Sequence, residues 1–302
     1  MGHDHGASAA NRGRLTVALT ISSVILLAEI VGAVLTGSLA LIVDAGHLLT
    51  DVGGLAMALL AASLAARAAT SKRTWGFARA EVLAATAQAA VLLAVGLFVL
   101  VEGIRRLVTP PDVPSAGLLL FGIIGLVGNL VSIAVLSGAR TAGFNLRAAF
   151  LEVVNDALGS LAVIVAAVVI ALTGWQRADA VAGILIGVLI LPRAFVLLRD
   201  TVDVLLESAP AGLDLDAVRI HLLQQDHVLG VHDLHATQIA SGLPVLTAHV
   251  TIEEECFTDG HTRQILDALQ ACVAEHFPVA VEHSTFQLEP AAHQGHEHTV
   301  HH

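Results

Sequence analysis

Six apolar stretches, each long enough to cross a lipid bilayer, occupy the first two thirds of this 302-residue sequence. A membrane-spanning helix needs about 20 apolar residues. We expect helices at residues 15–36, 39–66, 80–104, 115–138, 148–172 and 178–198. Charged residues form only 14% of the chain, whereas a soluble domain has about 25%. The composition excludes a disordered chain, a nucleic-acid-binding protein and most soluble enzymes, and it predicts a protein that crosses the membrane several times.

The distribution of Lys and Arg predicts how these helices are oriented. Ten basic residues lie on one side of the predicted membrane domain, and only Arg105, Arg106 and Arg177 lie on the other. Because basic residues accumulate in cytoplasmic loops, we expect both termini in the cytoplasm. The two cysteines, Cys256 and Cys272, are too few for a disulfide framework and fit a reducing compartment.

The last third of the chain has a different character. Residues 206–302 hold 14 acidic and 2 basic side chains, a net charge of -12, and 13 of the 16 histidines. Such a segment suits cations better than phosphates, although an ordinary acidic surface explains the charge equally well. The pattern predicts an α+β domain with the order helix 215–225, strands 231–239 and 244–253, helix 261–277 and strand 280–289.

We therefore expect four segments in the chain. A cytosolic N-terminal tail with histidines covers residues 1–14, and the six-helix membrane domain covers residues 15–205. The cytosolic α+β domain covers residues 206–289, and a His-rich disordered tail covers residues 290–302.

Two predicted membrane helices carry ionisable side chains in pairs. His47 and Asp51 lie four residues apart on the second helix, and Glu152 and Asp156 lie four residues apart on the fifth. This spacing places each pair on one face of its helix. Ionisable groups inside a membrane are costly and usually face a cavity or a partner. If the two helices are neighbours, four potential metal ligands converge.

One imidazole and three carboxylates suit a divalent transition metal such as Zn²⁺. The alternative is a set of interhelical hydrogen bonds or protonated carboxyls. Two matched pairs, without a basic residue in the middle of either helix to neutralise them, favour the metal site. The single polar residues Glu29, Gln88 and Asn129 are more typical of helix packing.

Several ordered motifs around these residues resemble one known family. SLALIVDAGHLLTDVGGLAMAL (38–59) and AAFLEVVNDALGSLAVIVAA (148–167) are similar to the second and fifth helices of cation diffusion facilitators. RTWGFARAEVLAA, GLVGNLVSIAVL and GVHDLHATQIASGLPVLTAHV are further matches. The resemblance extends over roughly residues 15–289.

The resemblance implies a homodimeric exporter of Zn²⁺ or a related divalent ion, driven by inward proton exchange, and not an enzyme. It implies six transmembrane helices and a cytosolic ferredoxin-like domain that binds regulatory metal. The transport site would be His47, Asp51, Glu152 and Asp156. Zinc-transporting relatives usually have His at the position of Glu152, so this more anionic site leaves Cd²⁺, Co²⁺, Mn²⁺ and Fe²⁺ open as substrates.

In the cytosolic domain the resemblance implies a second set of metal ligands. His232, His249 and His283 are the first candidates, followed by Glu289 and His261. We expect Cys256, near His261 in the sequence, to be a buried and inert thiol rather than a soft ligand.

Two other classes of protein compete with an exporter. A membrane metalloenzyme would need an open metal position and a general base, but the sequence has no His-Glu-x-x-His motif, and His47 has no second His on its helix. A metal sensor without transport would leave the charged pairs in the membrane unexplained. The expected partners are divalent metal ions, protons, the lipid bilayer and a second copy of the chain, with no nucleic acid.

Overall fold

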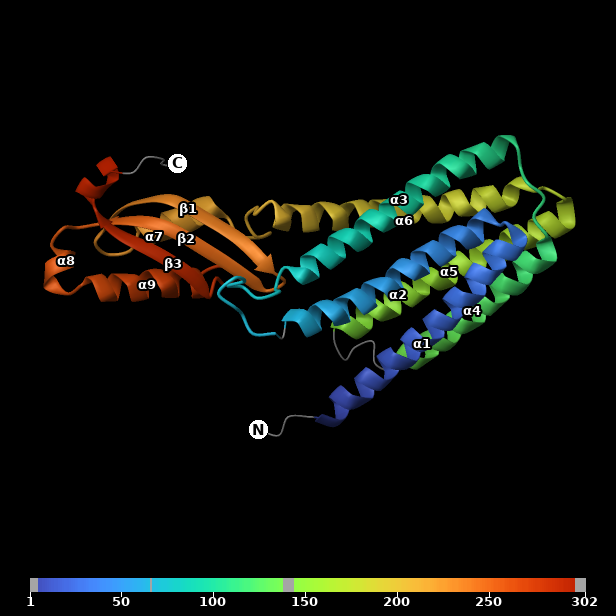
Figure 1. Ribbon diagram of the computed structural model, residues 1–302, viewed down its shortest axis with the longest axis horizontal. Coiled ribbons are helices and arrows are strands. Elements are labelled where there is room, and N and C mark those ends of the chain that lie inside the picture. Colours follow the sequence, from blue (N-terminus) through green and yellow to red (C-terminus); the bar gives the residue numbers. More distant parts are fainter. Residues whose placement is uncertain (1–4, 66, 138–143, 297–302) are drawn as a thin grey trace. The chain divides into compact units, whose positions relative to one another are not determined.

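The computed structural model describes residues 5–65, 67–137 and 144–296 (Figure 1). Side chains are not described for residues 5–15, 55, 56, 58–62, 65, 144–149 and 294–296. Contacts between residues divide the chain into two compact units. The first unit holds Met1–Leu59 and Ala87–Leu198, and the second holds Leu60–Thr86 and Arg199–His302. Residues 1–4 and 297–302, which include parts of both predicted tails, lie outside the described residues.

The six apolar stretches form six long helices. Their bounds are α1 (His5–Thr36), α2 (Leu39–Ala65), α3 (Ala80–Val108), α4 (Ser115–Ser137), α5 (Phe144–Thr173) and α6 (Arg177–Leu205). Within the described residues, five have the length and hydropathy of a membrane span. The remaining helix, α2, has 27 residues, several of them with undescribed side chains. The predicted fold class, a helical membrane domain followed by an α+β domain, is confirmed.

Several helices are longer than their apolar stretches. The first begins at His5, inside the predicted N-terminal tail. The third continues to Val108, beyond the predicted end at residue 104. There, Arg106 lies 2.9 Å from Glu102 one turn earlier and donates to the carbonyl of Gly37 at 2.6 Å. Hydropathy marks where the apolar run stops, whereas α3 continues through its polar residues and ends at Val108, shortly before Pro110 and Pro111, which cannot continue a helix.

Small residues allow the membrane helices to pack closely. α3 runs beside α6 (Figure 1), where Gly96 faces Leu191 and Gly103 faces Ile184. An added Cβ at either glycine would come within 2.6 Å of those leucine and isoleucine side chains. Leu39, Leu41 and Val43 of α2 are almost fully buried in the same apolar core, together with Val99, Leu118 and Val163. Such contacts hold helices together in a bilayer, where water provides no driving force.

The start of α2 is fixed by a carboxylate from another helix. Asp179, in the first turn of α6, is almost fully buried. It accepts hydrogen bonds from the backbone N–H of Leu39 at 2.6 Å and of Ala40 at 3.3 Å, and from the hydroxyl of Ser38. A carboxylate at this position satisfies N–H groups that have no partner inside the helix and complements the helix dipole. The contact therefore ties the first turns of α2 and α6 together.

The C-terminal domain follows the predicted order, with helices packed on a three-stranded sheet. Its elements are α7 (Leu215–Leu223), β1 (Val228–Ala240), β2 (Leu243–Ile252), α8 (Cys256–Asp259), α9 (Thr262–Glu275), β3 (His283–Pro290) and the 3-10 helix η1 (Ala291–His296). The sheet order is β1-β2-β3, with β2 antiparallel to β1 and parallel to β3. The helix α7 packs on β1, and α9 packs on β3 and contacts α7, so the two helices share a face.

Two elements of this domain differ from the sequence prediction. The four-residue helix α8 was not expected between β2 and α9, because one turn is too short to show periodicity. Residues Ala291–His296 form η1 directly after β3, where a disordered tail was expected. The histidine-rich composition predicted a disordered tail from residue 290. The chain instead forms a short 3-10 helix as it leaves the last strand of the sheet.

Candidate metal centres

The membrane domain brings together three of its four predicted ligands. His47 and Asp51 from α2 meet Asp156 from α5, and each offers one ligand atom within 4.8 Å of the others. The Nε2 atom of His47 lies 3.5 Å from Asp51 Oδ2 and 3.6 Å from Asp156 Oδ1. The spacing of four residues between His47 and Asp51 places both on one face of α2, as predicted.

His47 and Asp156 are buried, Asp51 is partly buried, and among the described residues all three have polar atoms without a hydrogen-bond partner. His47 and Asp156 are 8% and 6% exposed. Within the described part of the chain, His47 Nδ1, Asp51 Oδ2 and Asp156 Oδ1 are buried and have no hydrogen-bond partner. Interhelical hydrogen bonds, the alternative to a metal site, would have used these atoms. Buried polar atoms without partners are costly, and a bound cation would compensate them.

Glu152, the fourth predicted ligand, points to a different partner. It lies one turn before Asp156 on α5, but its Oε1 is 2.8 Å from Nη2 of Arg193 on α6. The side chains of Arg193 and Glu152 are 57% and 30% exposed, so this ion pair is partly solvated. Glu152 is not in the group of three ligands found among the described residues, and its role as a ligand stays a prediction.

Further polar groups lie between α1, α2, α4 and α5. Asp44, one turn before His47, is buried against Gly159 of α5, where an added Cβ would come within 2.8 Å of Asp44 Oδ1. Glu29 of α1 is buried near Gly125 of α4. The absence of a side chain at each glycine leaves the room that these carboxyl groups occupy. Asn129 donates to Ser160 at 3.3 Å, which fits its predicted role in helix packing.

The cytosolic domain holds a second group of three predicted ligands. His232 on β1 is the direct pairing partner of His249 on β2. Glu289 on β3 completes the group, with carboxylate oxygens 3.0 Å from His232 Nε2 and 3.8 Å from His249 Nδ1. Glu289 is only 2% exposed. Two imidazoles and a buried carboxylate on adjacent strands are suitable ligands for Zn²⁺.

The two remaining predicted ligands lie elsewhere. His283 is at the start of β3, six residues before Glu289, and its ring packs edge-on against Trp75 at 4.8 Å. His261 precedes α9, and its Nδ1 lies 2.7 Å from Asp259. Neither belongs to the group around Glu289.

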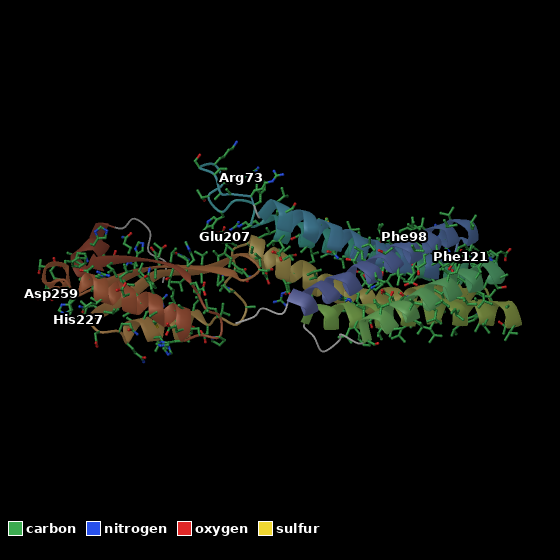
Figure 2. All side chains as sticks on the ribbon, turned by 90° about the horizontal axis from the view of Figure 1, so that it is seen from below. Arg73, Phe98, Phe121, Glu207, His227 and Asp259 are labelled. Carbon is green, nitrogen blue, oxygen red and sulfur yellow. The ribbon has the colours of Figure 1, made fainter. Side chains whose placement is uncertain are left out.

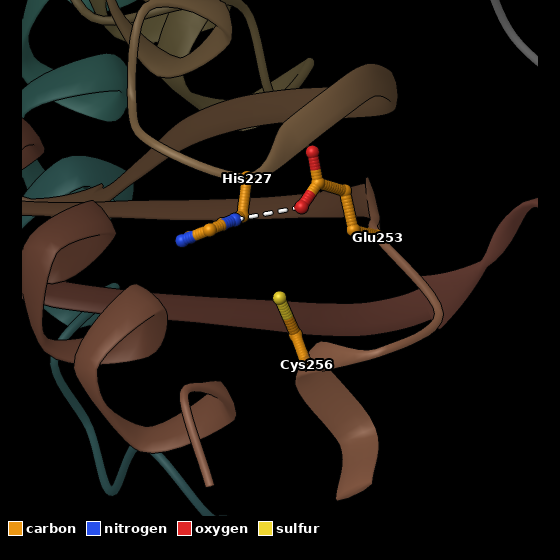
Figure 3. A group of neighbouring side chains, drawn as sticks. All are labelled: His227, Glu253 and Cys256. Atoms are coloured by element: carbon orange, nitrogen blue, oxygen red, sulfur yellow. Dashed lines mark hydrogen bonds and ion pairs between the residues drawn. The ribbon is translucent and has the colours of Figure 1, made fainter. Parts of the chain in front are cut away.

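A third group was not predicted from the sequence. His227, Glu253 and Cys256 each offer one ligand atom within 4.8 Å of the others (Figure 3). The hydrogen bond to Glu253, 2.7 Å long, raises the pKa of His227. Burial raises the pKa of the Cys256 thiol, and the negative charges of Asp259 and Glu253 raise it further. Cys256 is buried, as predicted, but it lies beside two further potential ligands.

A bundle of membrane helices that buries an imidazole and two carboxylates, followed by an acidic domain with clustered histidines, defines a cation-handling membrane protein. Comparison with known proteins identifies the family within this class of membrane proteins. Residues 15–206 match the cation efflux transmembrane domain, and residues 210–291 match the cation efflux protein cytoplasmic domain. The chain belongs to the cation diffusion facilitator family, as its motifs predicted. It is a multi-pass membrane protein with a cytoplasmic C-terminal domain, and its family is one of transporters rather than enzymes.

Several relatives align over nearly the whole chain. The metal cation efflux system protein CzcD of Cupriavidus metallidurans is 39% identical over 290 residues, which cover 96% of this chain and 90% of the relative. The cadmium, cobalt and zinc/H(+)-K(+) antiporter of Bacillus subtilis is 35% identical, with 97% and 93% covered. The zinc transporter ZitB of Escherichia coli is 35% identical, with 96% and 93% covered.

Proposed function

We propose that this protein exports Zn²⁺ or a related divalent cation, such as Cd²⁺ or Co²⁺, from the cytoplasm in exchange for protons. The names of its relatives support this range of substrates, because they include zinc, cadmium and cobalt transport and antiport with H⁺ and K⁺. We further propose that it acts as a homodimer in the cytoplasmic membrane with both termini in the cytosol.

The observation that carries the proposal is the group of His47, Asp51 and Asp156 between two membrane helices, in which His47 and Asp156 are buried and Asp51 is partly buried. A neutral imidazole and two carboxylates carry a charge of -2, which a divalent cation neutralises, and a third carboxylate ligand would leave the loaded site at -1. Imidazole suits Zn²⁺, whereas Mn²⁺ prefers oxygen ligands. We propose Glu152 as the fourth ligand, because it lies one turn from Asp156 on the same helix.

Exchange with protons follows from the chemistry of these ligands. Carboxylates and imidazole bind a metal ion only when they are deprotonated. The cation binds from the cytosol to the deprotonated site. When the site opens to the outside, protons compete for the same atoms and release the cation. The protonated site then returns and releases its protons inside.

We propose that His232, His249 and Glu289 form a regulatory Zn²⁺ site in the cytosolic domain. Metal at this site changes transport only if it binds with different affinity in the two transport states. The acidic surroundings, with a net charge of -12 over residues 206–302, favour cations over anions.

Flux measurements in inside-out vesicles test the export function. We expect competitive uptake of Zn²⁺, Cd²⁺ and Co²⁺ in exchange for protons, with Mn²⁺ and Fe²⁺ as weaker competitors. Asp51→Ala and Asp156→Asn should abolish flux, because each removes a ligand from the buried site. Asp112→Asn, in the exposed connection between α3 and α4, is the matched control and should retain it. Full flux by correctly inserted Asp51→Ala protein would exclude this site. Metal binding without flux in the wild type would favour a sensor.

A further inference from the structure

His227, Glu253 and Cys256 are brought together by the ends of the β1–β2 hairpin. His227 directly precedes β1, and Glu253 directly follows β2. The strands are antiparallel, so these ends meet, and the backbone N–H of Glu253 donates to the carbonyl of His227 at 3.2 Å. The side chains meet as well, through the 2.7 Å contact between His227 Nδ1 and Glu253 Oε2.

The thiol is held in place by the short helix that follows. Cys256 is the first residue of α8, and its backbone N–H donates to the carbonyl of Glu253 at 3.1 Å. The hydroxyl of Thr262 donates to the carbonyl of Cys256 at 2.7 Å. The side chain is fully buried and unoxidised, and its sulfur points toward the gap between His227 and Glu253 (Figure 3).

The surroundings of this group are acidic. Glu253, Glu255 and Asp259 all act electrostatically on the Cys256 thiol, and Asp226 and Asp259 act on His227. His227 and Asp259 lie close together at the same end of the domain (Figure 2). The ring of His261 is 5.3 Å from that of His227. Negative charge concentrated around a thiol and an imidazole attracts a cation.

We propose that His227, Glu253 and Cys256 form a further cytosolic binding site for a divalent cation with affinity for sulfur, Zn²⁺ or Cd²⁺. The site shares no residue with either centre used in the proposed function. His227 lies outside β1, five residues before His232, and the two groups are separate among the described residues. The inference therefore stands without transport activity.

The chemistry of the three ligands defines the class of cation. A thiolate, a carboxylate and a neutral imidazole together carry a charge of -2, so a divalent ion leaves the site neutral. In tetrahedral coordination with the usual bond lengths, ligand atoms lie about 3.4–3.7 Å apart. The group, already within 4.8 Å, reaches this spacing by small side-chain rotations. Water fills the fourth position, and binding displaces the thiol proton to solvent. Sulfur favours Cd²⁺ and Zn²⁺ over Mn²⁺ and Mg²⁺.

Cadmium–thiolate absorption in the ultraviolet tests the site directly in the full-length, chelator-treated protein in detergent. We expect Cd²⁺ to produce a charge-transfer band that saturates at one equivalent of thiolate-bound metal per protomer. Cys256→Ser should abolish the band. Cys272→Ser is the matched control, because Cys272 on α9 is also a buried free thiol of the same apolar cluster but belongs to none of the three ligand groups found among the described residues. It should retain the band.

His227→Ala and Glu253→Gln test the other two ligands. Each variant should weaken Cd²⁺ binding, measured from the same band, by at least about 100-fold. Removing a residue that only hydrogen-bonds to a metal ligand already costs up to about 100-fold in affinity, and loss of a ligand should cost at least as much. A band that survives in Cys256→Ser would overturn the proposal. So would a band that depends on Cys256 but keeps its affinity in both other variants, because it would reflect capture by a thiol alone. Vesicle flux tests the export function separately. Normal flux in a protein that shows no cadmium–thiolate band would reject only this site, and a band in a protein without flux would reject only the export function.

Discussion

Replacing Arg193 by Gln would test whether Glu152 belongs to the transport site. Arg193 holds the Glu152 carboxylate at 2.8 Å, and Glu152 must leave this partner to bind a metal ion. Both side chains are partly exposed, and such ion pairs contribute about 0.2–1 kcal/mol. Losing this contribution should tighten metal binding by a factor of about 1.4–5, since 1.4 kcal/mol corresponds to a tenfold change.

A double-mutant cycle separates this effect from the general effect of removing a positive charge. Zn²⁺ affinity would be measured by competition with a chelating dye for wild type, Arg193→Gln, Glu152→Gln and the double variant. Removing the arginine charge strengthens cation binding in every background, whereas release of Glu152 operates only when Glu152 is present. We therefore expect a larger gain from Arg193→Gln in the wild-type background. Equal gains in both backgrounds would show that Glu152 does not bind the metal.

Three further predictions concern other parts of the molecule. Glu152→His should raise the preference for Zn²⁺ over Mn²⁺ in vesicle competition, because an imidazole replaces an oxygen ligand; an unaltered ratio would count against Glu152 as a ligand. Asp179→Ala should destabilise the detergent-solubilised protein by about 1–3 kcal/mol, because the buried N–H groups of Leu39 and Ala40 lose their acceptor; thermal unfolding no lower than that of Asp112→Asn would contradict this. Glu253→Gln should lower the pKa of His227 in the metal-free protein, since the carboxylate that raises it is lost; histidine NMR titration measures this. In the wild type, the contact with Glu253 stabilises the fold fully below the unfolded-state pKa of about 6.5 and loses its effect as pH rises through the raised folded-state value.

The meeting of His47, Asp51 and Asp156 was predictable because helical periodicity determines which side chains share a face of a helix. His47 and Asp51 are four residues apart and therefore lie on one face of α2 wherever the helix packs. The apolar residues around them show that they lie inside the membrane domain. The ion pair of Glu152 with Arg193 was not predictable in this way. The two residues lie on different helices, 41 positions apart, and the direction of a long side chain depends on packing.

The cytosolic groups depend on strand register, which the sequence shows less clearly. His232 and His249 face one another only because β1 has an irregularity between His232 and His235 that shifts its pairing with β2. The turn at Ser241-Gly242 indicates a hairpin but not such shifts. The group around His227 was missed because His227 and Glu253 lie just outside the strands and Cys256 begins a one-turn helix, which no sequence periodicity indicates. Counting outward from the hairpin turn would have placed His227 near Glu253 and Cys256.

The contact between Asp44 and Gly159 links the identities of two residues that lie 115 positions apart in the chain. A methyl group at residue 159 would come within 2.8 Å of a carboxyl oxygen that has little room to retreat, because Asp44 is buried and its side chain is short. With Asp at residue 44, any residue larger than glycine at 159 requires the carboxyl group to shift, and a smaller residue at 44 relieves this conflict. Among related sequences these two positions should change together. If residue 44 alone is randomised, only side chains that fit the space beside residue 159 are tolerated. A search for new cation preference near Asp44 therefore has to vary residue 44 on α2 and residue 159 on α5 together.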